Sequence, residues 1–481
     1  MKKQSFPILL AALLLAAVPL SACGNAENTP DMPTGAVSET VSADTEETVT
    51  EPDYYDGLEN LDCGGYRFRI LSYLGDSWPL YLSSDGENGE LLNDAAFRRN
   101  LEISELLNCG IEAVYDKEYE KLFQNAVHAG DDSACDLVCF FSPGARASYI
   151  SENYVYDWKS VPHLRLNAPW YVQDANETFT VAGKQYFAVS DITFAGQQFA
   201  SILCNLRMLE SYDLPSPYTL VEEGTWTLDA LHTLTSGVYA DLNGNGKKDI
   251  GDQFGLVGHS NVFGRFIFCA GEPEVYGQAS GFALNLYSDK ITALVDRLRG
   301  MQAEDDICVD DAKSFEKFTD QTTLFALYAS DPAKLRDLTF DYGYLPFPKY
   351  DEAQKNYITE AAGGHMAIPV TASDIDRTGV IVEAMSAASR KYMSEAFIES
   401  YIENKVLRDE GSVSCYRLMR ETSRYNLSYN IDPTGSLASH IFYSKLWQKP
   451  SLMLASQYES QKDAFQKAYD KLFAAAEANK N

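Results

Sequence analysis

The strongest constraint on the fold is a regular alternation of short apolar runs with longer segments of helical periodicity. Residues 66–71 alternate in polarity, and residues 136–141 are almost continuously apolar, which is typical of a strand covered on both faces. Residues 91–107 and 118–129 carry apolar side chains at helical spacing, with a further strand near 111–114 between them. Strands that alternate with helices predict βαβ units and a mainly parallel sheet.

The same pattern returns in the second half of the chain. Strands are predicted at 199–203, 254–257 and 341–348, and helices at 228–236, 291–299, 374–409 and 450–480. The chain has 481 residues, which is enough for two domains. The sequence therefore predicts an α/β protein with two sets of alternating strands and helices.

The N-terminus has the order of a secretory signal. Lys2 and Lys3 precede a short apolar stretch at 6–19, and Leu20-Ser21-Ala22-Cys23 follows it. This tetrapeptide resembles a bacterial lipobox, which implies a signal peptide over 1–22 and lipidation of Cys23. The alternative is an ordinary cleaved signal peptide with a chance cysteine. Residues 23–60 are predicted to form a disordered tether, because they are acidic and poor in large aliphatic side chains.

Charge and cysteine content exclude some functions and leave others open. Asp and Glu number 69 against 39 Lys and Arg, and this net charge of −30 argues against nucleic acid as a partner. No second apolar stretch of about 18 residues follows the signal, so no spanning helix is predicted. Eight cysteines remain after Cys23, and their pairing stays open although export permits disulfides.

Several segments in order resemble the large, sugar-binding class of extracytoplasmic solute-binding lipoproteins that serve ABC importers. One of them is Pro169-Trp170-Tyr171, where family members usually read Pro-Trp-Trp, and another is Cys204-Asn205, where many carry Tyr-Asn. The segments are residues 89–100, 167–171, 204–209 with 225–229, 344–351 with 363–369, and 383–409.

The resemblance implies a fold of the type II periplasmic-binding-protein kind, with two lobes that close on a ligand about a hinge. The N-terminal lobe would comprise 61–192 plus 361–409, and the C-terminal lobe 193–360 plus 410–481. The chain would cross between lobes near 189–197 and 360–365. The family resemblance also implies capture of a small solute, expected to be a carbohydrate, and its delivery to ABC permease subunits. The protein is expected to act as a monomer, lipid-anchored at the extracytoplasmic face of the cell membrane.

A calcium loop is predicted at residues 241–252. Calcium prefers six to eight oxygen ligands, and this segment places oxygens at the spacing of an EF-hand or dockerin-type loop, with Gly246 at the sharp turn. The segment departs from that pattern because its last position is Asp and a strand follows, and the alternative is a polar turn without metal. The predicted ligands are Asp241, Asn243, Asn245, Lys247 through its carbonyl, Asp249 and Asp252.

Ligand-binding residues are expected on loops that follow strands, because ligands of open α/β sheets lie at that edge. Aromatic rings there would cover the C–H face of a sugar, and planar polar groups would bind its hydroxyls. Trp78 ranks first, whereas Trp226 precedes a helix and is better explained as a core residue. The candidates are Asp76, Trp78, Asn93, Ser142, Trp170, Trp226, Arg265, Tyr328 and Asp331.

The sequence lacks the motifs of several known catalytic classes. The sequence holds no GxSxG, HExxH or Walker motif, so a binding protein rather than an enzyme is predicted. Two alternatives remain: a surface receptor or adhesin with the same fold, and a secreted glycoside-cleaving enzyme that uses a pair of carboxylates.

Overall fold

The computed structural model describes residues 53–73, 81–140, 146–193, 198–278, 280–304, 306–329, 332–394, 396–435 and 441–480. Internal contacts separate residues 1–52 from the compact unit 53–481, which is the unit described here. The predicted signal peptide, Cys23 and most of the predicted tether lie outside the described residues. None of the described helices is long and apolar enough to cross a membrane.

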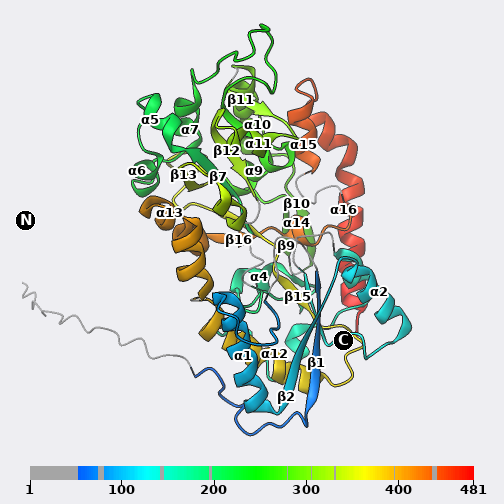
Figure 1. Ribbon diagram of the computed structural model, residues 1–481. Coiled ribbons are helices and arrows are strands. Elements are labelled where there is room, and N and C mark those ends of the chain that lie inside the picture. The colour runs from blue at the N-terminus through cyan, green and yellow to red at the C-terminus, as the bar shows by residue number, and fades with distance from the viewer. Residues whose placement is uncertain are drawn as a thin grey trace, which may run out of the picture. The chain divides into compact units, whose positions relative to one another are not determined.

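The first sheet has the order β15-β3-β1-β2. Its strands are β1 (Tyr66–Tyr73), β2 (Cys109–Asp116), β3 (Leu137–Phe140) and β15 (His365–Ala367). The helices α1 (Leu91–Leu107) and α2 (Tyr119–Ala129) connect its parallel strands, as the alternating pattern predicts. Helix α12 (Ile375–Ser389) packs on α1 beside this sheet (Figure 1). Only β15 runs antiparallel to its neighbour β3.

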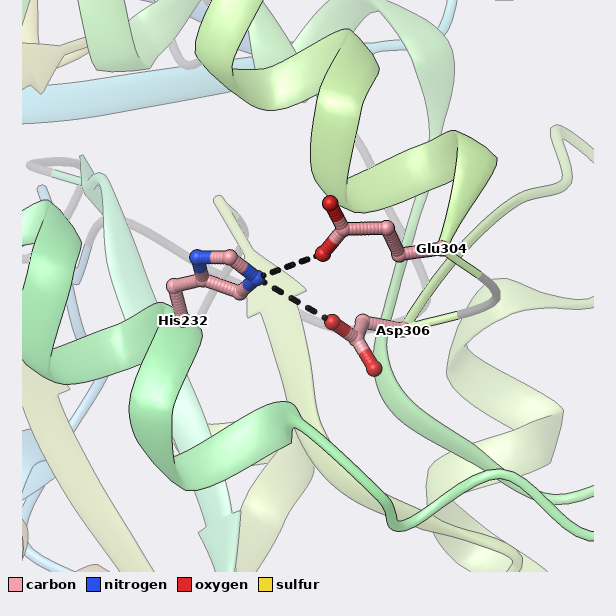
Figure 2. A group of neighbouring side chains, drawn as sticks. All are labelled: His232, Glu304 and Asp306. Atoms are coloured by element: carbon pink, nitrogen blue, oxygen red, sulfur yellow. Dashed lines mark hydrogen bonds and ion pairs between the residues drawn. The ribbon is translucent and has the colours of Figure 1, made fainter.

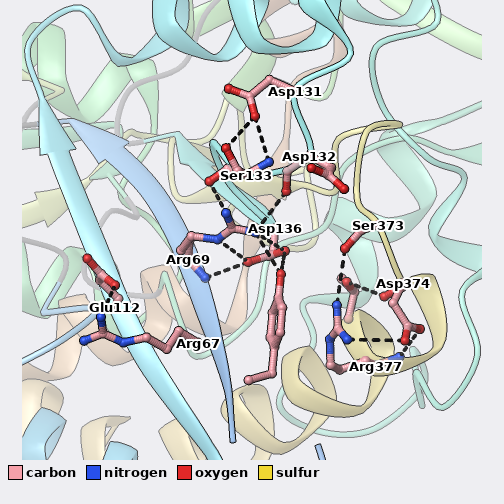
Figure 3. Close-up of polar contacts among 12 residues, drawn as sticks. Arg67, Arg69, Glu112, Asp131, Asp132, Ser133, Asp136, Ser373, Asp374 and Arg377 are labelled. Carbon is pink, nitrogen blue, oxygen red and sulfur yellow. Dashed lines mark hydrogen bonds and ion pairs between the residues drawn. The ribbon is translucent and has the colours of Figure 1, made fainter. Parts of the chain in front are cut away.

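An ion pair fixes the register of β1 against β3. Asp136 precedes β3, its side chain is almost fully buried, and its Oδ2 accepts hydrogen bonds from the Arg69 backbone N–H at 2.8 Å and from Arg69 Nε at 3.2 Å. Arg69 Nη2 also donates to the Asp132 carbonyl at 2.9 Å, so one guanidinium binds both the Asp136 side chain and the backbone of the turn before β3 (Figure 3). Because Arg69 lies within β1, this pair allows only one alignment of the two strands.

The second sheet has the order β11-β8-β12-β7-β13. Its strands are β7 (Ser201–Asn205), β8 (Phe254–Gly258), β11 (Ile307–Val309), β12 (Thr323–Tyr328) and β13 (Tyr342–Pro346). β8 is parallel to β11 and β12, whereas β7 is antiparallel to both of its neighbours. Each sheet is therefore mixed, with a single inverted strand, β15 in the first and β7 in the second.

The inverted strands show where the chain enters each sheet. β7 begins at Ser201 opposite Tyr328, the last residue of β12, and β15 begins at His365 opposite Phe140, the last residue of β3. Both strands follow segments predicted as crossings between lobes. The chain therefore reaches each sheet at the carboxyl edge of its parallel strands.

A third, three-stranded sheet joins these crossing segments in the order β16-β14-β6. Its strands are β6 (Gln198–Phe199), β14 (Thr359–Ala362) and β16 (Ser423–Tyr425). Ala361 pairs with Phe199 and Ala362 with Gln198, so two segments about 160 residues apart lie side by side. Gly363 and Gly364 follow with φ of 74° and 67°, a conformation that disfavours other residues.

The predicted helices are present, and the region 374–409 holds one difference. There α12 continues into π-helical turns at Arg390–Ser394 and Ala396–Val406 rather than into a regular α-helix. The remaining elements are α3 (Ala147–Ser151), η1 (Trp158–Ser160), α4 (Gln173–Thr178), β4 (Thr180–Val181), β5 (Lys184–Gln185), α5 (Leu206–Ser211), α6 (Pro217–Glu222), α7 (Leu228–Thr235), α8 (Ser260–Phe263), α9 (Arg265–Cys269), β9 (Val275–Gln278), β10 (Gly281–Leu284), α10 (Asp289–Ala303), α11 (Ser314–Thr319), η3 (Pro332–Asp337), α13 (Glu410–Glu421), α14 (Leu427–Asn430), α15 (Ile441–Gln448) and α16 (Leu454–Ala478).

The predicted tether, residues 23–60, extends too far at its C-terminal end. Leu58 is buried, and the ring of Tyr54 stacks on Trp170 at a centroid distance of 6.2 Å. Tyr55 donates through its hydroxyl to Glu102 Oε1 at 2.6 Å. Residues 53–60 therefore belong to the folded unit, because two tyrosines and a leucine provide apolar surface that the preceding acidic residues lack. The eight cysteines after Cys23 are free thiols, six of them buried.

Candidate functional site

The carboxyl edges of the two sheets are the places where side chains are best positioned for a ligand. The loops after β1, β3 and β12 leave from these edges. Four of the predicted ligand-binding residues, Asp76, Trp78, Ser142 and Asp331, lie on these loops but outside the described residues. Among the described residues, the candidates for ligand binding at these edges are those at the ends of the strands and in the turns that follow them.

A cavity of about 590 Å³ lies at the carboxyl edge of the first sheet. It forms where β1 ends and where the turn after β2 leads into α2. Both neighbouring strands are parallel, so their last residues lie together at this edge. The lining residues are Tyr73, Lys117, Glu118, Tyr119, Glu120, Lys121 and Gln124.

Three hydrogen bonds hold the Glu120 carboxylate in this cavity. Arg146 Nη2 donates to Oε1 at 2.8 Å, and the Tyr149 hydroxyl donates to Oε2 at 2.7 Å. The Tyr119 hydroxyl donates to Oε1 at 3.0 Å. Burial raises the pKa of Tyr119 and Tyr149, so both phenols stay protonated donors. The carboxylate is therefore preorganised, and 37% of the Glu120 side-chain surface is exposed.

A buried histidine supports the arginine that holds Glu120. Arg146 Nη1 lies 3.0 Å from His365 Nε2, and its guanidinium lies 4.2 Å from the centroid of the Phe140 ring. Burial, with the positive charge of Arg146 as a second cause, lowers the pKa of His365 well below its usual range. The imidazole is therefore neutral and accepts the hydrogen bond through Nε2. His365 begins β15, so this inverted strand helps to position Arg146, which in turn holds Glu120 in the cavity wall.

The composition of the cavity suits a polyhydroxylated ligand. Tyr73 and Tyr119 meet edge to face at a centroid distance of 6.0 Å, and Tyr73 is half-buried. An exposed ring face can cover apolar C–H groups, and a fixed carboxylate accepts hydroxyl hydrogens. Lys117, Lys121 and Gln124 add donors around the same space.

The edge of the second sheet contributes one predicted residue, Tyr328. It ends β12, it is 5% exposed, and its ring lies 5.4 Å from that of Phe315. Ser201 Oγ donates to the Tyr328 carbonyl at 3.1 Å. The structure therefore places Tyr328 at the predicted edge but packs its ring largely against protein.

Helix α14 contacts two buried arginines, Arg146 and Arg265. Its Asn430 carbonyl accepts the Arg146 N–H at 3.4 Å, and the Arg265 guanidinium lies 4.8 Å from the Tyr429 ring centroid. Arg265, a predicted ligand residue, is 4% exposed, and its Nη1 donates to Glu360 Oε2 at 2.6 Å. The structure thus places Arg265 at the start of helix α9 with its charge paired within the protein, rather than on a loop as the sequence predicts.

Two predicted tryptophan platforms are core residues. Trp226 has no exposed surface, and its Nε1 donates to the Pro346 carbonyl at 2.9 Å. Trp170 is 1% exposed, with Nε1 donating to Glu383 Oε1 at 3.2 Å and the Arg165 guanidinium 4.7 Å from its ring centroid. Both rings are covered on their faces because large apolar surfaces pack wherever a core can enclose them.

Asn93 has a local structural role. It lies in the first turn of α1, where its Nδ2 donates to the Gly86 carbonyl at 2.7 Å and its Oδ1 accepts from Ser84 Oγ at 2.8 Å. These bonds close the turn before the helix. The sequence analysis did not single out Tyr73, Tyr119 or Glu120, although Tyr119 and Glu120 begin the helix predicted at 118–129, which follows the strand predicted near 111–114.

The loop 241–252 folds around its first aspartate. The Asp241 carboxylate accepts the N–H groups of Gly244 at 2.6 Å and Gly246 at 2.8 Å. Gly246 has a φ of 68°, so the sharp turn expected at this position is present. The Asp249 carboxylate accepts from the amides of Asn243 at 3.0 Å and Asn245 at 2.7 Å, and these bonds lower its pKa.

The loop also holds a buried carboxylate oxygen. Asp252 is fully buried, and its Oδ2 accepts from the Asp249 N–H at 3.0 Å. Its Oδ1 has no hydrogen-bond partner among the described residues. An unsatisfied buried carboxylate oxygen costs free energy, and a cation would offset that cost. Asp252 Oδ1 is therefore an oxygen that a cation in this loop would satisfy.

Comparison of the coordinates with known structures identifies the fold. An ABC substrate-binding protein of Listeria monocytogenes, in complex with cycloalternan, aligns with a TM-score of 0.54 at 11% identity, covering 84% of this chain and 98% of that one. The cyclic alpha-maltosyl-1,6-maltose binding protein of Arthrobacter globiformis aligns with a TM-score of 0.55 at 12% identity, covering 86% and 100%. The maltotriose binding protein of Thermus thermophilus aligns with a TM-score of 0.51 at 14% identity, covering 83% and 99%.

No family model and no curated protein sequence matches the chain. The similarity is thus one of fold and extends over most of the folded unit. The chain has the two-lobed α/β fold of solute-binding proteins, as the sequence predicts.

Proposed function

We propose that this chain is an extracytoplasmic solute-binding protein that captures a carbohydrate and delivers it unchanged to an ABC importer. The observation that carries the proposal is the fold, which is shared over more than four fifths of the chain with proteins whose bound ligands are oligosaccharides. Delivery to permease subunits follows from the same resemblance. Binding without turnover agrees with the lack of catalytic motifs in the sequence.

The cavity at the edge of the first sheet supplies half of the proposed binding site. The ring of the half-buried Tyr73 would stack on a pyranose, while Glu120 Oε2, which accepts one hydrogen bond from Tyr149, would accept a second from a sugar hydroxyl. The carboxylate needs no reorganisation because Arg146 and Tyr149 already hold it. Ligand contacts to both lobes exist only in a closed form, so ligand would favour closure.

The substitution Glu120→Gln tests this assignment. It removes the charge that the hydroxyls and Arg146 share, and we expect sugar affinity to fall by about 1.5–3 kcal/mol, which is typical of a hydrogen bond to a charged group. A thermal-shift screen with linear and cyclic α-linked gluco-oligosaccharides would find the ligand, and calorimetry would measure both variants. Glu316→Gln, an exposed carboxylate on α11, is the matched control and should bind as the parent does. Equal affinity of Glu120→Gln and the control would remove this cavity from the site.

We further propose that Cys23 carries a lipid that holds the protein at the membrane. The support is the order of Lys2 and Lys3, the apolar stretch and Leu20-Ser21-Ala22-Cys23. The acidic residues that follow would extend the tether by mutual repulsion. This arrangement would keep the folded unit near a permease.

Calcium in the loop 241–252 is a separate proposal. Asp241, Asn243, Asn245, Asp249 and Asp252 would provide side-chain oxygens, and Lys247 its carbonyl. Binding would replace the bonds that now join the two asparagine amides to Asp249, and it would satisfy the buried Oδ1 of Asp252. The metal would rigidify the C-terminal lobe and take no part in sugar capture.

A further inference from the structure

Three potential metal ligands converge at the end of the second sheet, away from the proposed sugar cavity and outside the calcium loop. His232 lies in the last turn of α7, Glu304 caps the C-terminus of α10, and Asp306 begins the turn into β11. Figure 2 shows both carboxylates directed at the same imidazole nitrogen. One ligand atom from each residue lies within 4.8 Å of the other two.

The charges of this group are not balanced by the group itself. His232 Nε2 lies 3.0 Å from Glu304 Oε2 and 3.4 Å from Asp306 Oδ2, and a single N–H cannot serve both carboxylates well. The Asp306 side chain is only 5% exposed, and its Oδ2 also accepts from Ser236 Oγ at 3.3 Å. Even with a protonated imidazole the three side chains carry a net negative charge. A divalent cation would neutralise it.

The surrounding backbone also favours a bound cation. Helix α7 ends at Thr235 and the 15-residue helix α10 ends at Ala303, so two helix C-termini meet at the group. Carbonyl groups at a helix C-terminus carry partial negative charge and attract cations. This feature is independent of the side chains.

We propose that His232, Glu304 and Asp306 form a binding site for a divalent ion of the zinc class. Imidazole and carboxylate ligands at 2.0–2.2 Å in a tetrahedral arrangement would lie about 3.3–3.6 Å apart. The observed separations of 3.0 and 3.4 Å from Nε2 need little adjustment to reach that range. Water would complete the coordination. The ion would join α7 to the α10–β11 turn and stabilise that part of the C-terminal lobe.

The test is calorimetric titration of the full chain, produced without a metal-binding tag, with zinc chloride in the presence of saturating calcium. We expect one zinc ion per chain and a rise in melting temperature. His232→Ala and Glu304→Gln should each weaken zinc binding at least about 10-fold, since loss of even a supporting group costs 10–100-fold. Glu304 is exposed, so its substitution leaves folding intact.

His163→Ala is the matched control, because His163 contacts the carboxylate of Asp376 at 3.0 Å on the surface of another part of the chain. It should bind zinc as the parent does. Zinc affinity that is equal in His232→Ala and His163→Ala would overturn the proposal, and so would loss of the zinc site on Asp241→Ala alone, which would move it to the calcium loop. Sugar binding is measured separately, so failure of either proposal leaves the other testable.

Discussion

Glu383 is a buried carboxylate of α12, and its substitution tests the structural role that its hydrogen bonds give to Trp170. The Glu383 side chain has no exposed surface. Arg165 donates to it through Nε at 2.8 Å and through its backbone N–H at 3.0 Å, and the Tyr171 hydroxyl donates at 2.9 Å. Trp170 Nε1 is the fourth donor, at 3.2 Å. Residues 165–171 are thereby fastened to α12.

Glu383→Gln keeps the volume and removes the charge. One amide N–H₂ then faces groups that are themselves donors, and Arg165 loses its carboxylate partner in the interior. Breaking a buried pair on one side costs about 3–5 kcal/mol, and we expect that loss of unfolding free energy. By contrast, the pair of Arg98 with Glu87 at 2.6 Å is exposed on both sides, and such pairs contribute about 0–1 kcal/mol.

Urea unfolding of Glu383→Gln and Glu87→Gln, followed by tryptophan fluorescence, measures this difference. The first variant should unfold at clearly lower urea, and the second should be close to the parent. Sugar affinity of folded Glu383→Gln should be unchanged, because Trp170 and its partners are buried. Equal stability of the two variants would refute the structural role assigned to Glu383 and Trp170.

Three further predictions concern the lipid anchor, the calcium loop and a buried acid. Cys23→Ala should move the protein from the membrane fraction to the soluble fraction; a variant that stays membrane-bound after salt washing contradicts lipidation. Chelation of calcium should lower the melting temperature, and Asp241→Ala should abolish that response; a melt unchanged by chelation would favour a metal-free turn. Burial raises the pKa of Asp191 to about 6 despite the nearby Arg390, so between about pH 4 and 6 the folded chain keeps a proton that the unfolded chain has released. Unfolding free energy should therefore fall by about 3 kcal/mol as pH rises through this window, from about two pKa units at 1.36 kcal/mol each, and Asp191→Asn should remove that part of the pH profile in urea titrations; an unchanged profile would contradict the raised pKa.

Local patterns predicted the elements of the fold well. The helix expected over 91–107 has those limits in the structure, and within the apolar run at 136–141 residues Leu137–Phe140 form a strand buried at every position. Periodicity reports which face of an element is covered, and these elements have strongly biased faces. The direction of β7 and β15 was not predictable in the same way, because it depends on where the chain crosses between sheets.

The site residues were harder to predict because they are joined by contacts distant in sequence. Glu120 is fixed by Arg146, 26 residues away, and Trp170 is held by Glu383, 213 residues away. His232 meets Glu304 across 72 residues. No spacing rule reports such pairs, so a loop tryptophan and a core tryptophan look alike until the fold brings their partners together.

The central claim is reversible sugar binding without chemistry, and one calorimetric titration addresses it most directly. An oligosaccharide selected by thermal shift is titrated into the full chain. The sugar is then recovered from the calorimeter cell and analysed by chromatography. We expect saturable binding of one oligosaccharide per chain and recovery of the sugar intact. Absence of binding across the linear and cyclic panel, or recovery of shorter sugars that disappears when a pair of carboxylates is replaced, would contradict it.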